Sequence, residues 1–280
     1  MPLKLMYITN SEDVAHIAEE AGVDRIFVDM EYIGKTDRQG GMDTVQSRHT
    51  ADDVRRLAQC LNKSELFVRV NPIHEKTDKY SSSKEEIDEV IEAGADLLML
   101  PYFKTAEEVQ TFVKYVNGRA KTVLLVETPE AAAIAEDLVQ IPGIDEMFIG
   151  LNDLSLGYGK NFMFELLLDG TVEELCLKFR KGGIPYGFGG IASLGKGMLP
   201  SEYVIKEHYR LGSACAILSR SFCRTDQVTD LKEIQKIFET ELPKIRQLEE
   251  ECSVHSQYFW KNRQQVETKI RQICECEDAK

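Results

Sequence analysis

The chain has 280 residues, enough for one large domain or two small ones with a sizeable core. Its 34 basic and 47 acidic residues give a formal net charge of −13, so we expect neither nucleic acid nor an anionic membrane as a main partner. No apolar run approaches the roughly 20 residues of a membrane-spanning helix, and the opening MPLKLMYITN lacks the pattern of a secretory leader. The seven scattered cysteines form no C-x-x-C pair, which predicts reduced thiols and a cytoplasmic location.

Short apolar runs alternate with longer amphipathic segments along most of the chain. The first four runs are LKLMYIT (3–9), RIFVDM (25–30), ELFVRV (65–70) and DLLML (96–100). The next four are TVLLVE (122–127), EMFIG (146–150), PYGFG (185–189) and ACAIL (214–218). Helical patterns follow these runs, which predicts a parallel α/β fold. The count favours a (β/α)8 TIM barrel over an open doubly wound sheet, and no G-x-G-x-x-G follows the first run.

The residues after this alternation form two further helical segments. Leu231, Ile234, Phe238, Ile245 and Leu248 lie close to the a and d spacing of a heptad, and a charged segment follows from about residue 258 to residue 276. Pro243 is expected to kink or divide the first segment. We therefore predict a barrel domain over 1–226 and extra C-terminal helices over 227–280 that pack on a neighbouring subunit of a homo-oligomer. A helix closing its own barrel is the alternative.

Polar residues gather at the predicted carboxyl ends of the strands, where barrel enzymes build their active sites. These strand-end residues are Asp29, Glu31, Tyr32, Arg69, Asn71, Tyr102, Lys104, Glu127, Asn152 and Asp153. Glu127 and Asp153 close neighbouring strands, and two hard carboxylates suit Mg²⁺ or Mn²⁺. Arg69 at the same level would clamp a carboxylate through paired hydrogen bonds. Taken singly, Glu127 could be a helix cap, Asp153 a turn residue and Arg69 a structural ion-pair partner.

Basic residues are concentrated in the same predicted loops and strand ends, although the chain is acidic overall. They are Lys35, Arg38, Arg48, Arg69, Lys76, Arg220 and Arg224. Such a basic mouth would attract a small anionic substrate. Ordinary solvated loop charges are the alternative interpretation.

Four stretches of this sequence resemble the HpcH/HpaI aldolase and citrate lyase β-subunit family. They are AEEAGVDRIFVDMEY, VRVNP, EAGADLLMLPYFKTAEEV and LLVETPEA…IAEDLVQIPGIDEMFIGLNDLSLGYG. The resemblance implies a carbon–carbon lyase or aldolase that acts on a small α-keto or 2-hydroxy acid through a metal-stabilised pyruvate enolate. It implies that Glu127 and Asp153 hold Mg²⁺ or Mn²⁺. It also implies that Arg69 and the backbone amides around Gly150, Leu151 and Asn152 bind the keto acid, with Asp29, Glu31 and Tyr32 as further catalytic residues.

The chain departs from the family pattern at two positions. Aldolase members read D-x-E-H after the second strand, and Tyr32 stands where that histidine is expected. Leu125 stands where they carry a glutamine. Tyr32 could relay a proton if its pKa were depressed, and His49 and His74 are other candidates. Two alternatives follow: a lyase for a CoA thioester of the malyl or citramalyl type, or a non-catalytic barrel that only binds metal and keto acid.

Overall fold

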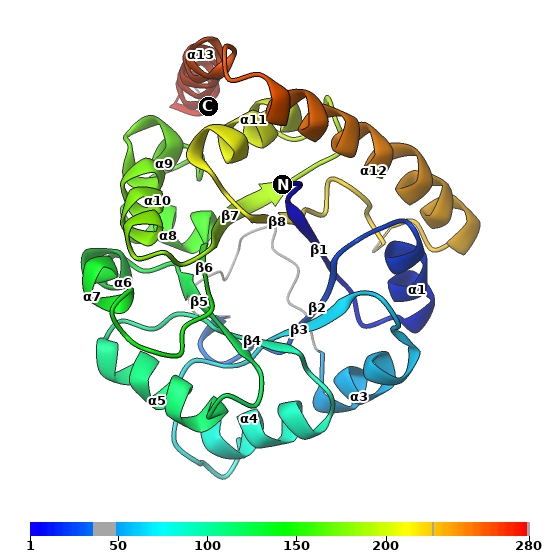
Figure 1. The fold of residues 1–280 in the computed structure, drawn as a ribbon, viewed down its shortest axis with the longest axis vertical. Coiled ribbons are helices and arrows are strands. Elements are labelled where there is room, and N and C mark those ends of the chain that lie inside the picture. The colour runs from blue at the N-terminus through cyan, green and yellow to red at the C-terminus, as the bar shows by residue number, and fades with distance from the viewer. Residues whose placement is uncertain (36–48, 226, 279–280) are drawn as a thin grey trace.

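The computed structural model describes residues 1–35, 49–225 and 227–278 of the chain. Eight parallel strands form a closed barrel in the order of the sequence (Figure 1). They are β1 (Lys4–Ile8), β2 (Arg25–Asp29), β3 (Glu65–Arg69), β4 (Leu97–Leu100), β5 (Lys121–Val126), β6 (Glu146–Ile149), β7 (Tyr186–Ile191) and β8 (Cys215–Leu218). Each strand arises from one of the eight predicted apolar runs, so the predicted TIM-barrel fold is confirmed.

Helices surround the barrel. They are α1 (Glu12–Glu20), α3 (Ala51–Cys60), α4 (Ser83–Glu92), α5 (Ala106–Val116), α6 (Pro129–Ala133), α7 (Ala135–Leu138), α8 (Leu151–Gly157), α9 (Glu165–Leu168), α10 (Thr171–Lys181), α11 (Ser201–Leu211), α12 (Leu231–Val254) and α13 (Phe259–Asp278). Thr50, Ser82 and Thr105 begin α3, α4 and α5 with reciprocal capping boxes, which explains why these helices start where they do. Within the described residues, no helix has both the length and the apolar character needed to cross a membrane.

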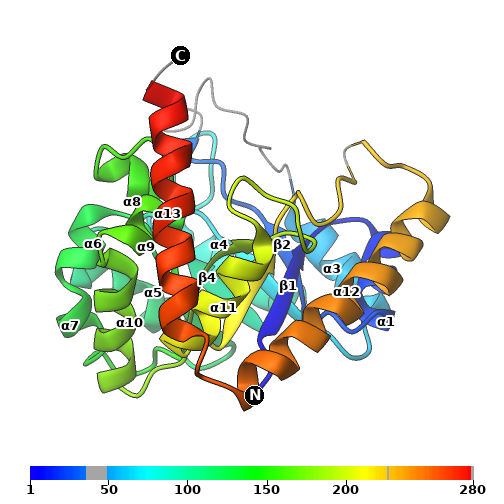
Figure 2. The same ribbon diagram turned by 90° about the horizontal axis from the view of Figure 1, so that it is seen from above.

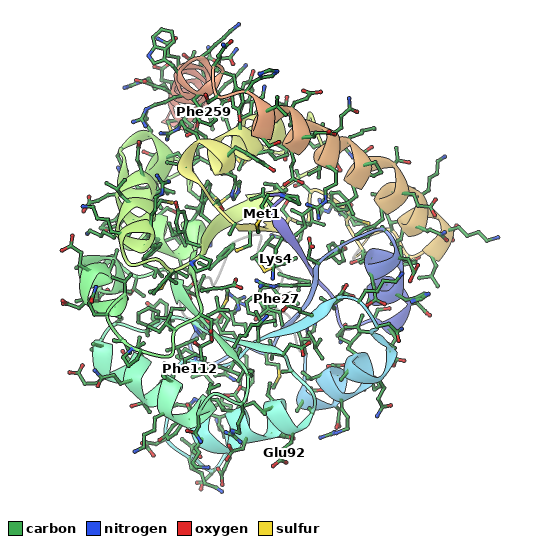
Figure 3. The ribbon with its side chains drawn as sticks, in the orientation of Figure 1. Met1, Lys4, Phe27, Glu92, Phe112 and Phe259 are labelled. Carbon is green, nitrogen blue, oxygen red and sulfur yellow. The ribbon has the colours of Figure 1, made fainter. Side chains whose placement is uncertain are left out.

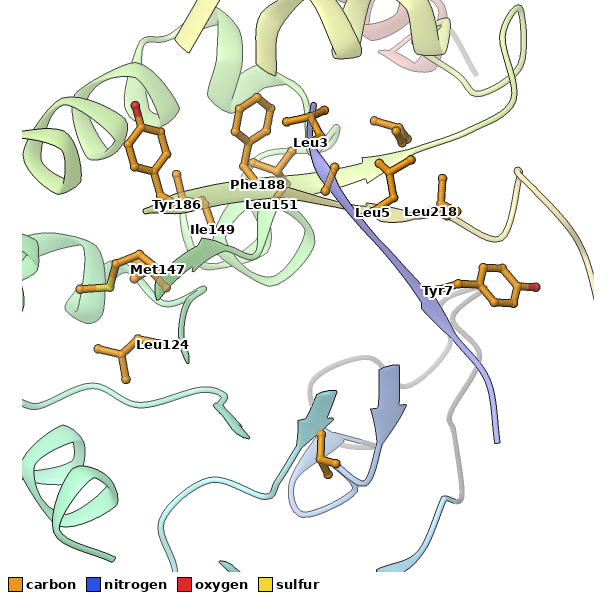
Figure 4. Close-up of a cluster of buried hydrophobic side chains, with 14 of the residues drawn as sticks. Leu3, Leu5, Tyr7, Leu124, Met147, Ile149, Leu151, Tyr186, Phe188 and Leu218 are labelled. Carbon is orange, nitrogen blue, oxygen red and sulfur yellow. The ribbon is translucent and has the colours of Figure 1, made fainter. Parts of the chain in front are cut away.

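Side chains alternate between the two faces of each strand, as the two-residue period of a strand requires. The interior holds Met6, Phe27, Phe67, Leu97, Met99, Val123, Leu125, Phe148 and Cys215. The intervening residues face the helices, and Figure 4 shows part of this outer layer, including Leu5, Ile149 and Phe188. In the full side-chain view, Phe27 lies near the barrel axis and Phe112 lies among the surrounding helices (Figure 3). The same alternation directs Arg25 and Asp29, two residues before and after Phe27, into the interior.

Arg25 closes the amino-terminal end of the barrel. Its side chain is 1% exposed, and its Nη1 donates to Glu146 Oε2 at 2.7 Å while its Nε donates to Glu65 Oε2 at 2.9 Å. Lys4 and Lys121 also pair with Glu65 near the surface. This ion-pair network lies at the end of the barrel opposite the strand ends singled out above.

Helices α12 and α13 both pack on the barrel of their own chain. Helix α12 lies against α1 and α11, and α13 lies against α11 and α9 (Figures 1 and 2). Arg246 of α12 donates to Leu3 O at 2.7 Å and to Asp24 at 2.8 Å. Helix α12 follows β8 and fills the gap between α11 and α1, so it completes the ring of barrel helices. Pro243 does not divide α12, which is continuous from Leu231 to Val254. The domain boundary at residue 226 stays a prediction. A neighbouring subunit on these helices stays a prediction.

Candidate active site at the carboxyl ends of the strands

The strand register brings the predicted acidic and basic residues to one end of the barrel interior. Asp29 pairs with Arg69 across β2 and β3, and Val126 pairs with Ile149 across β5 and β6. The next residues on β5 and β6 are Glu127 and Gly150. Because Phe27, Phe67 and Leu125 are interior residues, the side chains two positions later point to the same side. Asp29, Arg69 and Glu127 thus share the interior at its carboxyl end.

Asp29, Glu31, Arg69 and Lys35 form a compact group of two acids and two bases, which we call the charge quartet. Arg69 holds Asp29 with two hydrogen bonds, from Nε to Oδ1 at 2.8 Å and from Nη2 to Oδ2 at 2.7 Å. Lys35 Nζ donates to Asp29 Oδ2 at 2.8 Å. Glu31 Oε2 lies 3.4 Å from Arg69 Nη1 and 3.6 Å from Lys35 Nζ. Burial alone would raise the pKa of Asp29, but Arg69 and Lys35 outweigh it and hold that pKa well below its usual value.

Glu127 is a buried carboxyl group with other acids close to it. Its side chain accepts the backbone N–H of Tyr102 at 2.9 Å, and only 4% of the residue is exposed. Burial, followed by the charge of Glu31, raises the pKa of Glu127 to about 8; Arg69 opposes the shift and Asp153 adds to it. A buried carboxyl group beside two other carboxylates is unfavourable when ionised, unless a cation joins them.

The absence of a side chain at Gly150 makes room for Glu127. A Cβ atom at position 150 would lie 2.7 Å from Glu127 Cβ and 2.9 Å from Glu127 Oε2. Gly150 also precedes α8, whose start has no side-chain hydrogen bond to cap it in the described structure. The backbone here is therefore shaped around the Glu127 carboxyl group.

We expect Gly150→Ala to displace Glu127 and to weaken Mg²⁺ or Mn²⁺ binding by at least about tenfold, as outer-shell changes at metal sites commonly do. Gly182→Ala is the matched control, because a Cβ there would lie 2.6 Å from Val139 Cβ, at a contact between the ends of α10 and α7 that does not involve Glu127. Metal titration and thermal unfolding of both variants separate the two effects. Equal loss of metal affinity in both variants would contradict this role of Gly150.

The donor set fits a hard divalent cation. Asp29, Glu31, Glu127 and Asp153 bring four carboxylates to this end of the barrel, and Arg69 and Lys35 bring two positive charges. The excess of two negative charges is what a divalent cation would neutralise, and Glu127 and Asp153 are the acids outside the charge quartet. Oxygen donors of this kind suit Mg²⁺ or Mn²⁺.

A second acidic group lies elsewhere. His16, Glu19 and Glu20 of α1 bring ligand atoms within 4.8 Å of one another. However, Glu19 Oε1 accepts the backbone N–H groups of residues 62–64, so Glu19 caps the turn that leads into β3. We therefore assign this group to the packing of α1 and not to the site.

Tyr32 lies at the mouth of the barrel with 47% of its surface exposed. Its ring packs against Tyr80, with ring centroids 5.4 Å apart. Burial of the phenol raises its pKa, and Glu86 and Tyr80 raise it further. The depressed pKa that a tyrosine base would need is therefore not found in this structure, and the phenol stays protonated at neutral pH.

The two loop histidines have different surroundings. Both ring nitrogens of His74 lie within 2.8 Å of backbone carbonyl oxygens, those of Pro72 and Ser81, so the imidazole fixes its own loop. His49 accepts the backbone N–H of Asp29 at Nδ1 over 3.0 Å. Burial lowers the pKa of His49. The His49 ring thus contacts the backbone of Asp29, a member of the charge quartet, whereas the His74 ring does not.

Two residues of the predicted basic mouth lie inside the site, and the others that the structure describes are exposed. Arg69 and Lys35 belong to the charge quartet, while the Lys76 side chain is 68% exposed and pairs with Glu85. Arg220 and Arg224 are exposed at the end of β8. Arg38 and Arg48 lie outside the described residues. The sequence predicted Lys35 as part of the basic mouth. Its contact with Asp29 was not predicted, because it depends on the turn at Gly34.

Comparisons with known proteins agree with this fold. The family model described as HpcH/HpaI aldolase/citrate lyase matches residues 4–166, and no curated protein sequence matches the chain significantly. An HpcH/HpaI aldolase/citrate lyase family protein from Burkholderia cenocepacia J2315 has 17% identity and a TM-score of 0.62, over 84% of this chain and 95% of that chain. An HpcH/HpaI aldolase from Desulfitobacterium hafniense DCB-2 has 15% identity and a TM-score of 0.60, over 84% and 93%. Citrate synthase SbnG has 16% identity and a TM-score of 0.57, over 88% and 94%.

Proposed function

Because the chain belongs to the HpcH/HpaI aldolase/citrate lyase family of carbon–carbon lyases, we propose that it is a divalent-metal-dependent lyase or aldolase for a small α-keto or 2-hydroxy acid. The observation that carries the proposal is the buried carboxyl group of Glu127, placed beside Arg69 at the carboxyl end of the barrel and raised in pKa by its acidic neighbours. A bound cation would stabilise the charged form of such a buried carboxyl group. Arg69 could bind the carboxylate of an anionic substrate through paired hydrogen bonds.

Glu127 and Asp153 would hold Mg²⁺ or Mn²⁺. When bound, the cation would supply Lewis acidity that stabilises negative charge on the substrate as its enolate forms. Arg69 would bind the substrate carboxylate with the donors that Asp29 leaves free, together with the backbone amides of Leu151 and Asn152. The N–H of Gly150, which was also predicted for this role, donates to Val126 O at 3.0 Å instead. Arg69 has five N–H donors; Asp29 takes two of them and Glu31 approaches Nη1 at 3.4 Å, so donors remain for the carboxylate of a substrate.

Tyr32 would act as a proton donor. A phenol with a raised pKa is a poor base, but it can donate a hydrogen bond or a proton to the oxygen of an aldehyde during condensation. We expect Tyr32→Phe to slow condensation while leaving the exchange of pyruvate methyl protons, which involves no aldehyde, close to the wild-type rate. A parallel loss of both reactions would contradict this role.

Two simple reactions test the proposal. Wild-type protein with Mg²⁺ or Mn²⁺ should decarboxylate oxaloacetate and exchange the methyl protons of pyruvate, and a chelator should stop both reactions. A second candidate, a barrel that binds metal and keto acid without catalysis, is favoured by Tyr32 at the histidine position. That barrel would bind the ligands but give neither reaction. Malyl-CoA and citramalyl-CoA extend the substrate screen to thioesters.

We also propose that the protein forms a homo-oligomer through α12 and α13. Three large apolar side chains are exposed at the ends of these helices: Leu231, Val254 and Trp260. A monomeric mass by light scattering would contradict this proposal.

A further inference from the structure

Lys35 is brought back over the strand ends by a tight turn. Gly34 adopts a positive φ of 72°, which a glycine accepts without strain, and Lys35 N donates to Tyr32 O at 3.3 Å. Asn71 Oδ1 accepts the backbone N–H groups of Tyr32 and Ile33, each at 3.0 Å. The turn is therefore fastened to Asn71, two residues after β3, and it directs the Lys35 side chain, which is only 6% exposed, toward the site.

The position of Lys35 determines the charge around Arg69. Without Lys35, Asp29 and Glu31 would place two negative charges against the single positive charge of Arg69. With Lys35, the two acids and two bases of the charge quartet balance. A substrate carboxylate that approaches Arg69 then meets a neutral group with free N–H donors, and not a net negative one.

The orientation of Arg69 leaves part of the guanidinium free for such a contact. Its plane is fixed by Asp29 on one edge and by Phe27, whose ring centroid lies 5.8 Å from Arg69 Cζ. Arg69 Nη1 lies 3.4 Å from Glu31 Oε2. This distance is longer than the hydrogen bonds from Nε and Nη2 of Arg69 to Asp29. Lys35 shares Glu31 and Asp29 with Arg69, so it limits how firmly the two acids hold the guanidinium.

We propose that Lys35 is a positioning residue that balances Asp29 and Glu31 and thereby keeps Arg69 available for the carboxylate of the substrate. This inference rests on the proposed metal and keto-acid site and assigns one of its specificity determinants. A salt bridge with a purely structural role would stabilise the fold without changing the balance between anion and cation binding. Removal of a charge-balancing lysine should instead weaken anion binding and leave cation binding unchanged or stronger.

The test is binding of oxalate, a small dianion, in the presence of saturating Mn²⁺, together with binding of Mn²⁺ alone. In Lys35→Met, oxalate affinity should fall by about ten- to a hundredfold, as expected for a unit charge removed within several ångströms of an anion. Mn²⁺ affinity should stay the same or rise, because the site becomes more negative. Lys35→Arg, which keeps the charge, should restore most of the oxalate affinity.

A double variant separates charge from structure. Glu31→Gln together with Lys35→Met returns the site to the wild-type net charge, so it should bind oxalate at least about tenfold more tightly than Lys35→Met alone. It also leaves no unpaired buried acid, which protects the fold if the single variant is unstable. Lys76→Met removes an exposed lysine at the same mouth and should leave both affinities unchanged.

Each outcome has a separate meaning. If wild-type protein binds both ligands and Lys35→Met binds oxalate equally well, or the double variant brings no recovery, the Lys35 inference is wrong and the metal site stands. If Lys35→Met loses Mn²⁺ and oxalate together while it stays folded, Lys35 is structural and the inference is again wrong. If wild-type protein binds neither ligand, the proposed function itself fails, and the role of Lys35 fails with it.

Discussion

Glu127→Gln is expected to weaken Mg²⁺ or Mn²⁺ binding by at least about a hundredfold and to abolish metal-dependent turnover, because it removes a negatively charged ligand from a buried site. Asp153→Asn, in α8, should likewise weaken metal binding and abolish metal-dependent turnover. The fold should persist, since glutamine at position 127 replaces a carboxyl group that burial already disfavours in its charged form. Calorimetric metal titration and circular dichroism measure the two effects.

Glu130→Gln provides the matched control three residues later in the chain. Its carboxylate is exposed and pairs with Lys104, so this change should leave metal affinity at the wild-type level. Unaltered metal affinity in both Glu127→Gln and Asp153→Asn would remove the proposed metal site.

The pH dependence of metal binding follows from the same carboxyl group. The pKa of Glu127 is raised to about 8 without metal, so a cation that binds at lower pH must displace a proton. The apparent metal affinity should therefore increase with pH, by up to about tenfold per unit below pH 8, and level off above it. Glu127→Gln should lose this dependence along with the binding.

Arg25→Met is expected to destabilise the protein by about 3–5 kcal/mol, the cost of removing one partner from a buried ion pair. Glu146 would lose its hydrogen bonds to the guanidinium, while Glu65 would keep Lys4 and Lys121. Metal affinity should not change in the protein that remains folded, because Arg25 lies at the other end of the barrel from Glu127. Urea unfolding measures the free energy of unfolding.

Two further variants make this stability prediction specific. Arg55→Met removes an arginine that is 48% exposed and pairs with Asp52, and should cost less than about 1 kcal/mol. Adding Glu146→Leu to Arg25→Met removes the unpaired acid and should recover part of the lost stability. An Arg25→Met variant as stable as Arg55→Met would show that the ion-pair network around Arg25 does not stabilise the amino-terminal end of the barrel.

The sequence predicted the strands well because each one is a short apolar run bounded by turn residues and followed by a helix. Once those strands were placed in a barrel, the two-residue period directed Asp29, Arg69 and Glu127 to one end of the interior. These positions depend only on local periodicity and strand order, which a single sequence carries.

The packing of the C-terminal helices could not be derived in the same way. The spacing of Ile234, Phe238 and Ile245 indicates a helix with one apolar face, but it does not say which surface covers that face. In the structure these residues are buried on their own barrel. The same spacing would serve a contact with another subunit equally well.

The places of Lys35 and Tyr32 depend on tertiary structure. Lys35 reaches Asp29 because Gly34 turns the chain and Asn71 holds the turn, and no periodic pattern records either contact. Tyr32 has a raised pKa because Glu86 and Tyr80 approach it from a different loop and helix. Sequence reasoning could identify both residues but could not assign their surroundings.

Calorimetric titration of oxalate into the wild-type protein, with and without Mg²⁺ or Mn²⁺, is the decisive measurement for the proposed metal and keto-acid site. Oxalate resembles the enolate of pyruvate and carries the carboxylate that Arg69 is proposed to bind. We expect oxalate binding that requires the metal. Absence of binding with either metal, or binding of equal strength in a chelator, would contradict a metal and keto-acid site at Glu127, Asp153 and Arg69.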